Sequence, residues 1–214
     1  MRKENIKSET DLQGWFTNKL NACLKAKGKI MVGWNEVLAR DIDTDIVAQY
    51  WTPKKDDNVF KHLQKGGKVI LSNHKYFYFD RRYSYCSPKD TYNFTYKDSN
   101  VSEECKDNVL GVEGENWTEW TRTEKALFFK IFNRGLALAE TAWSDESVKD
   151  YGSFVKRMES QKKIMDALDI FYGSDDITMQ KAKFRKTILS KRYGFSHNDN
   201  DSEFRLQEIL GGLK

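Results

Sequence analysis

Cysteine is scarce in this chain of 214 residues, and the few that occur exclude a disulfide-rich fold. Cys23, Cys86 and Cys105 are too few for a disulfide framework, and they lack the spacing of a metal-binding motif. Cys86 and Cys105 could pair across the segment between them, but two isolated thiols are the favoured state. We therefore expect free cysteines and no cysteine metal site.

Histidine and glycine-rich motifs are equally sparse, which argues against a metal or a nucleotide cofactor. His62, His74 and His197 are far apart in the sequence and show no ligand spacing. The glycine pairs at residues 66–67 and 211–212 lack the flanking pattern of a phosphate-binding loop. The Gly-x-Ser-x-Gly elbow of serine hydrolases does not occur. The sequence predicts no cofactor and no metal.

Long apolar runs and an excess of charge of one sign are also missing. No segment approaches the ~18 apolar residues of a membrane span, and the N-terminal MRKENIKSETD lacks the apolar stretch of a secretory signal. The 36 basic and 32 acidic side chains leave a formal net charge of +4, spread along the chain. We predict no membrane span and no nucleic-acid partner, and these features indicate no particular compartment.

Aromatic residues are plentiful at 14 %, and short apolar runs alternate with helical periodicity. The periodicity predicts helices at residues 9–27, 56–64, 123–143 and 147–168, and basic amphipathic helices at 178–193 and 202–210. The apolar runs predict strands at residues 29–34, 45–51, 68–72 and 109–112. Short apolar strands separated by helices are typical of a parallel sheet covered on its faces, so the predicted fold class is α/β.

Aromatic and acidic side chains follow the carboxyl ends of all four predicted strands. They are Trp34, Trp51, Tyr78, Asp80, Trp117 and Glu119. Because functional sites collect at the carboxyl ends of parallel strands, we expect these side chains to form one site. The alternative is that Trp34 and Trp51 simply fill the core.

Indole rings beside carboxylates and a tyrosine hydroxyl suit a pyranose sugar. A sugar has an apolar C–H face that lies against an indole, and hydroxyl groups that donate to carboxylates. Several tryptophans around one point would also make an apolar box for an acetamide methyl group. The residue types therefore indicate a site for an N-acetylated sugar.

Five motifs in one order resemble family 20 glycoside hydrolases, the β-N-acetylhexosaminidases. They are GWNE at 33–36, QYW at 49–51, YFYFD at 76–80, LGVEGENWTE at 110–119 and NRGLALAETAWS at 133–144. The resemblance covers about residues 12–172 and implies a TIM (β/α)₈ barrel, of which the four strands are strands five to eight. It implies two regions: residues 1–172 as the C-terminal half of the catalytic barrel, and residues 173–214 as a helical C-terminal extension.

The resemblance also implies a function, the removal of terminal β-linked N-acetylhexosamine (GlcNAc or GalNAc) from glycans by substrate-assisted retaining hydrolysis. In that mechanism the acetamide oxygen of the substrate attacks the anomeric carbon. Trp34, Trp51 and Trp117 would wall the acetamide pocket, and Tyr78 would donate its hydroxyl to the acetamide carbonyl.

The same resemblance gives Asp80 and Glu119 the task of accepting hydrogen bonds from the outer sugar hydroxyls. The tryptophan that often follows the Tyr-x-Asp loop is not evident, and Tyr92 or Phe94 are the candidates for its place. A parent protein of this family could be secreted or lysosomal.

The general acid of the family is missing from this chain. In the family it belongs to an adjacent Asp-Glu pair preceded by a histidine and glycines, and no such stretch occurs here. We therefore expect the isolated chain to be inactive and to need the N-terminal half of the barrel, or a self-associated copy, as a partner. The alternative is a non-catalytic sugar-binding or interaction module that lacks the catalytic pair.

The remaining polar residues of the motifs allow structural or site-supporting roles. Glu36, Gln49 and Glu113 are predicted to be hydrogen-bond partners of the site or of the fold. For the long helix, we expect a buried structural pair of Arg134 with Glu140. Trp143 is expected to pack in the interior.

Overall fold

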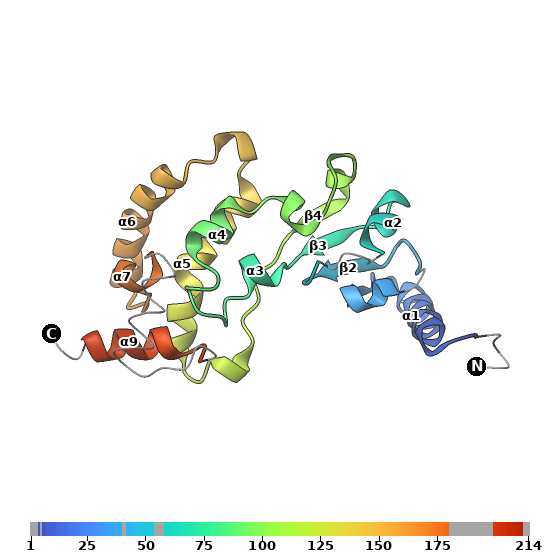
Figure 1. Ribbon diagram of the computed structural model, residues 1–214, viewed down its shortest axis with the longest axis horizontal. Helices are drawn as coiled ribbons and strands as arrows, with labels where there is room; N and C mark the ends of the chain where they lie inside the picture. Colours follow the sequence, from blue (N-terminus) through green and yellow to red (C-terminus); the bar gives the residue numbers. More distant parts are fainter. Residues whose placement is uncertain (1–3, 5, 40–41, 54–57, 180–198, 212–214) are drawn as a thin grey trace. The chain divides into compact units, whose positions relative to one another are not determined.

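The computed structural model describes residues 1–214 except residues 1–3, 5, 40–41, 54–57, 180–198 and 212–214 (Figure 1). The chain divides into two compact units. Unit 1 comprises Met1–His74 and Thr95–Glu113, and unit 2 comprises Lys75–Phe94 and Gly114–Lys214.

Unit 1 is built on a four-stranded parallel sheet in the order β1-β2-β3-β4. The strands are β1 (Val32–Trp34), β2 (Val47–Tyr50), β3 (Val69–Leu71) and β4 (Val109–Val112). The predicted α/β class with a parallel sheet is thus confirmed. The first strand starts three residues later than residues 29–34 suggested, since Lys29 and Ile30 precede the ladder.

The two faces of this sheet differ in burial. Tyr50 and Leu71, which pair in register, are fully buried on one face. The register places Trp34 beside Gln49 on the other face, where Trp34 is 36 % exposed and Val32 is 50 % exposed. The prediction of a covered sheet therefore holds for the face of Tyr50 and Leu71, whereas the face of Trp34 is covered only in part.

Helices and 3₁₀ turns connect the strands of unit 1. They are α1 (Glu9–Lys25), η2 (Asn35–Ala39), α2 (Val59–Gln64), η3 (Tyr96–Ser99) and η4 (Glu103–Asn108). Helix α1 begins where the Ser8 hydroxyl accepts from the Asp11 amide, and it is followed by Gly28 with φ of +65°. The predicted helix at residues 9–27 is confirmed to within two residues.

Unit 2 is mainly helical. Its helices are α3 (His74–Phe77, which begins at the last residue of unit 1), α4 (Pro88–Asn93), η5 (Thr118–Trp120), α5 (Glu124–Trp143), η6 (Glu146–Val148), α6 (Tyr151–Ala167), α7 (Asp175–Thr178) and α9 (Ser202–Gly211). The helices predicted at 123–143, 147–168 and 202–210 are confirmed, while most of 178–193 lies outside the described residues. Within the described residues, no helix combines the length and hydropathy that crossing a bilayer requires.

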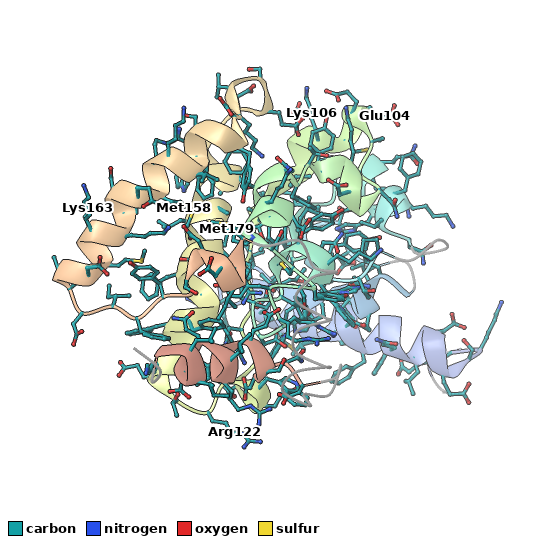
Figure 2. The ribbon with its side chains drawn as sticks, turned by 60° about the vertical axis from the view of Figure 1, so that its left-hand side comes forward. Glu104, Lys106, Arg122, Met158, Lys163 and Met179 are labelled. Atoms are coloured by element: carbon teal, nitrogen blue, oxygen red, sulfur yellow. The ribbon has the colours of Figure 1, made fainter. Side chains whose placement is uncertain are left out.

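Two apolar clusters hold the helices of unit 2 together. One contains Tyr83, Phe129 and Phe204, and joins α9 to α5. The other contains Phe154 and Met158 of α6. Figure 2 shows Met158 on the inner side of α6, whereas Lys163 extends from the opposite side. These clusters give unit 2 an apolar interior of its own.

Candidate functional site

The strand ends of unit 1 hold the first two predicted site residues. Trp34 is the last residue of β1, and Trp51 directly follows β2. The Trp51 indole donates to the Glu36 carboxylate at 3.2 Å, and its backbone amide donates to Asn35 Oδ1 at 3.1 Å. Trp34 is partly exposed and Trp51 is half-buried, so neither fills the core. Glu36 thereby has a partner in the predicted site, the ring of Trp51.

In unit 2 two segments that are distant in the sequence run side by side. Tyr78 forms a parallel bridge with Glu115, and the Phe79 amide donates to the Glu115 carbonyl at 2.7 Å. Gly114 permits this approach, because a Cβ there would lie 2.7 Å from the Phe79 ring. The motifs around Tyr78 and Trp117 are therefore brought together as predicted for this pair.

Tyr78 is nearly buried and lies against Trp117, with ring centroids 6.2 Å apart. Burial raises the pKa of Tyr78 to about 12, and a hydrogen bond with the Trp117 side chain opposes this shift. The hydroxyl therefore keeps its proton at neutral pH and can serve as a hydrogen-bond donor. Trp117 itself is 40 % exposed, so a face of its ring is open to a ligand.

Asp80 has the most unusual environment of the predicted residues. Only 4 % of it is exposed, and its Oδ1 atom has no hydrogen-bond partner among the described residues. Burial raises the pKa of its carboxyl group, against the effects of its own backbone amide and of Arg81, Arg134 and Lys130. A buried polar atom without a hydrogen-bond partner is costly for folding.

The last predicted residue, Glu119, is exposed on η5 directly after Trp117. Tyr78, Asp80 and Trp117 thus belong to unit 2, whereas Trp34 and Trp51 belong to unit 1. Among the described residues, no group of three or more His, Cys, Asp or Glu side chains could hold a metal ion. The three cysteines are free thiols.

Two expectations for the long helix α5 are wrong. Glu140 pairs with Arg157 of α6, while the fully buried Arg134 donates to backbone carbonyls instead. Trp143 is 90 % exposed, because it is the last residue of α5 and faces away from both clusters. The helical periodicity correctly identified the apolar face of α5. It does not show that the last residue of the helix extends beyond the apolar clusters.

Other polar residues also find structural partners. Gln49 donates to the Ser72 hydroxyl at 3.1 Å, whereas Glu113 is exposed. Tyr92 stacks on Phe154 with ring centroids 4.8 Å apart, and its hydroxyl accepts from the Asp150 amide. Phe94 is equally buried. Tyr92 and Phe94 are therefore buried side chains of unit 2.

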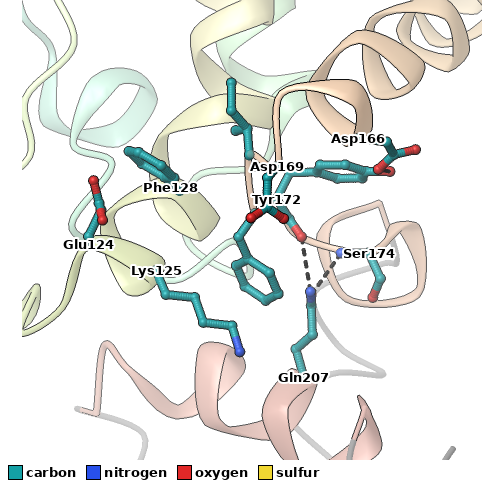
Figure 3. Close-up of a pocket in the computed structure, with 10 residues that line it drawn as sticks. Glu124, Lys125, Phe128, Asp166, Asp169, Tyr172, Ser174 and Gln207 are labelled. Atoms are coloured by element: carbon teal, nitrogen blue, oxygen red, sulfur yellow. Dashed lines mark hydrogen bonds between the residues drawn. The ribbon is translucent and has the colours of Figure 1, made fainter.

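Sequence reasoning missed two cavities of unit 2. One, of about 600 Å³, lies between the start of α5, the segment 166–174 and α9 (Figure 3). There Gln207 donates to the Tyr172 carbonyl and accepts from the Ser174 amide. The other, of about 560 Å³, is lined by Trp120, Arg122 and residues of α9. Neither cavity is lined by a predicted site residue, and no motif signalled them.

Comparison with protein families gives a match over residues 1–146 to the catalytic domain of glycosyl hydrolase family 20. That match covers more than half of the chain. The chain belongs to glycosyl hydrolase family 20.

Relatives within the family include hexosaminidases of bacteria and a protozoan. The beta-hexosaminidase of Porphyromonas gingivalis is 22 % identical over 90 % of this chain and 27 % of its own length. The beta-hexosaminidase subunit beta of Entamoeba histolytica is 29 % identical over 70 % of this chain and 29 % of its own length. The chain therefore spans less than a third of the length of these curated relatives.

Solved structures agree on the fold. The family 20 exo-β-N-acetylglucosaminidase of Vibrio harveyi superposes with a TM-score of 0.72 at 19 % identity, over 81 % of this chain and 29 % of that one. The Flavobacterium johnsoniae chitobiase gives a TM-score of 0.62 at 28 % identity, over 88 % of this chain and 28 % of that one. Membership of the family and the α/β fold are thus supported independently.

The resemblance to family 20 implies a general acid in an adjacent Asp-Glu pair, and one such pair occurs in this chain. The sequence contains one adjacent Asp-Glu, Asp145-Glu146, without a preceding histidine. Both residues are exposed, and Asp145 caps η6 by accepting from the Ser147 amide at 2.9 Å. This pair follows the C-terminus of α5, far in the sequence from any strand end, and its role is that of a helix cap.

Proposed function

We propose that this chain supplies strands five to eight of a (β/α)₈ barrel that removes terminal β-linked N-acetylhexosamine from glycans. Residues 1–172 would be the barrel half, and residues 173–214 a C-terminal extension. Family membership, four parallel strands in chain order and a span below a third of the relatives' length support this assignment. The half-exposed apolar face of the sheet is the surface that the other four strands would cover.

In this proposal the aromatic residues bind the acetamide group. Trp34, Trp51 and Trp117 wall its pocket, and Tyr78 donates its hydroxyl to the acetamide carbonyl. The raised pKa of Tyr78, about 12, keeps this donor protonated over the whole physiological range. The attack on the anomeric carbon is intramolecular because the acetamide belongs to the same sugar, and holding it in one orientation lowers the entropic cost further.

The acidic residues would select a terminal sugar. Asp80 and Glu119 accept hydrogen bonds from the outer hydroxyls, so a substrate with a further sugar at that end is rejected. A site built to bind a hydroxyl discriminates strongly against analogues that lack it, because its own polar atoms are then left unpaired.

Hydrolysis would proceed by substrate-assisted retention. The acetamide oxygen forms a bond to the anomeric carbon as the glycosidic bond breaks, and water then opens the resulting oxazolinium ring from the opposite side. A general acid from the other barrel half protonates the departing oxygen. Without that acid we expect the rate to fall by about 10²–10⁴-fold, and the isolated chain to be practically inactive.

The observation that carries the proposal is the arrangement in unit 2. Tyr78 lies against Trp117, and the nearby Asp80 keeps a buried oxygen without a protein partner among the described residues. Burying an unsatisfied carboxylate is unfavourable for folding, so a function in ligand binding accounts for it.

The proposal is tested by hydrolysis of an aryl N-acetyl-β-glucosaminide after the chain has been joined to a family 20 N-terminal half. We expect turnover, and a loss of about 10²-fold in kcat for Tyr78→Phe. Tyr96→Phe is the matched control, since Tyr96 lies outside the five motifs and its hydroxyl donates to the Glu103 carboxylate. A folded, completed protein without turnover would overturn the proposal.

A second candidate is a sugar-binding module without catalysis. The absence of the family's Asp-Glu stretch from the sequence favours it. Calorimetric titration of the chain alone with GlcNAc or its thiazoline analogue separates the two, because a half-pocket binds weakly whereas a complete module binds without a partner.

A further inference from the structure

The loop that carries Asp80 depends on other segments for its hydrogen bonds. Residues 79–86 contain turns and bends but no helix or strand of their own. Backbone groups in such a segment need partners elsewhere when they are buried. Two buried ionic side chains supply them, Arg134 of α5 and Glu203 of α9, and both belong with the loop to unit 2.

Arg134 binds the carbonyl side of the loop. Its guanidinium donates to the carbonyls of Phe79 and Arg81, the two neighbours of Asp80, and to that of Cys86. The planar, five-donor guanidinium is suited to binding several carbonyls at fixed directions. This group therefore fixes the backbone on both sides of Asp80.

Glu203 binds the amide side of the same loop. Its Oε1 accepts from the Ser84 amide at 3.0 Å, and its Oε2 accepts from the Tyr83 amide. Glu203 is only 1 % exposed, so both of its oxygens act in a dry environment where charge-assisted hydrogen bonds are strong. The loop is thus held between a buried cation and a buried carboxylate.

Glu203 lies in the first turn of α9, and contacts with α5 hold this helix in place. Phe204 packs on Phe129 of α5, with ring centroids 5.6 Å apart. Two residues before Glu203, Asp201 pairs with the buried Lys130 at 2.5 Å. Figure 1 shows α9 lying against the lower end of α5. The segment lies beyond residues 1–146, which the family model matches.

We propose that Glu203 is a positioning residue, through which the C-terminal segment sets the place of Asp80 and hence the recognition of the outer sugar hydroxyls. This inference rests on the proposed function of Asp80. A buried carboxylate must be aligned closely with its ligand hydroxyl, because small displacements weaken such contacts severely. Glu203 supplies that alignment without touching the sugar.

The first test measures hydrogen exchange in the 214-residue chain. Glu203→Gln keeps the size of the side chain but places an amide N–H₂ against a backbone N–H. We expect exchange of the Tyr83 and Ser84 amides to become about tenfold faster. Glu208→Gln is the matched control, since Glu208 lies on the same helix, is exposed and pairs with Lys125 at the surface. Equal exchange in the two variants would overturn the inference.

A second variant covers the case in which Glu203→Gln does not fold. Phe204→Leu weakens the packing of α9 but keeps the carboxylate. We expect exchange of the Tyr83 and Ser84 amides to become faster together with that of α9, because the loop loses the Glu203 carboxylate whenever α9 opens. Full protection of these two amides while α9 exchanges faster would contradict the role of Glu203.

The second test measures specificity in the completed enzyme, with aryl glycosides that have or lack the 4- or 6-hydroxyl. We expect Asp80→Asn to abolish the preference for the hydroxylated substrate, and Glu203→Gln to reduce it about fivefold through KM. If Asp80→Asn leaves the preference intact, the proposed role of Asp80 is wrong. If only Glu203→Gln leaves it intact, the positioning role is wrong; general destabilisation would lower activity on all substrates alike.

Discussion

Units 1 and 2 differ in what they leave exposed and what they bury. In unit 1 one face of the sheet is buried around Tyr50 and Leu71, while Val32 and Leu110 on the strands are half-exposed. In unit 2 the charged side chain of Arg134 is completely buried, and backbone carbonyls accept its hydrogen bonds. Exposed apolar surface is characteristic of an interface whose partner is absent. Buried charges with hydrogen-bond partners are characteristic of a completely packed interior. This difference supports the proposal that unit 1 is the part that needs a further four strands.

The largest effect is expected at the buried cation of unit 2. Arg134→Met leaves the carbonyls of Phe79, Arg81 and Cys86 without a donor, so we expect the free energy of unfolding to fall by at least about 3 kcal/mol. Arg157→Met is the matched control, because Arg157 forms an exposed pair with Glu140, and should cost below about 1 kcal/mol. Urea denaturation measures both. Similar losses in the two variants would show that the buried charge is not what stabilises unit 2.

The next effect concerns the covered face of unit 1. Leu71→Ala removes a fully buried side chain of β3 and should cost about 2–4 kcal/mol. Leu110→Ala alters a side chain of β4 that is 53 % exposed and should change stability by less than about 0.5 kcal/mol. The pair is compared by thermal unfolding. A large loss for Leu110→Ala would mean that the second face is already covered.

A smaller effect of the opposite sign is expected at Asp80. The pKa of its carboxyl group is raised above the ordinary 3.8 by burial, so the folded state binds this proton more tightly than the unfolded state does. Asp80→Asn should therefore stabilise the protein at neutral pH, on the order of 1 kcal/mol. The advantage should shrink as the pH falls through the raised pKa towards 3.8. Unfolding at pH 7 and pH 4 checks this, and an unstable variant at pH 7 would contradict it.

The smallest effect on the chain itself is expected for Leu110→Lys. The substitution places a charge on the exposed sheet face and should leave the unfolding of the chain nearly unchanged. The same charge should prevent the N-terminal barrel half from covering that face, since burying it without a partner is costly. Co-purification of the two halves gives the answer. Undiminished association would show that the halves meet elsewhere.

The sequence predicted the four strands and the pairing of the Tyr78 and Trp117 motifs, because strand ends and motif order are local signals. It did not predict the partners of Arg134 or the exposure of Trp143, since long-range packing decides both. Apolar periodicity indicated no helix between residues 73 and 107, although Ser87 and Asp90 form a capping box for α4, with Pro88 as its first residue. Nothing local signalled that Glu203 would bind amides 119 residues away.

The most direct measurement of the central claim is calorimetric titration with the thiazoline analogue of GlcNAc, for the chain alone and for the chain joined to a family 20 N-terminal half. The account predicts binding at least about 10²-fold tighter for the joined protein, because the N-terminal half supplies the rest of the pocket. Equally tight binding by the chain alone would contradict the half-barrel assignment and favour an independent sugar-binding module.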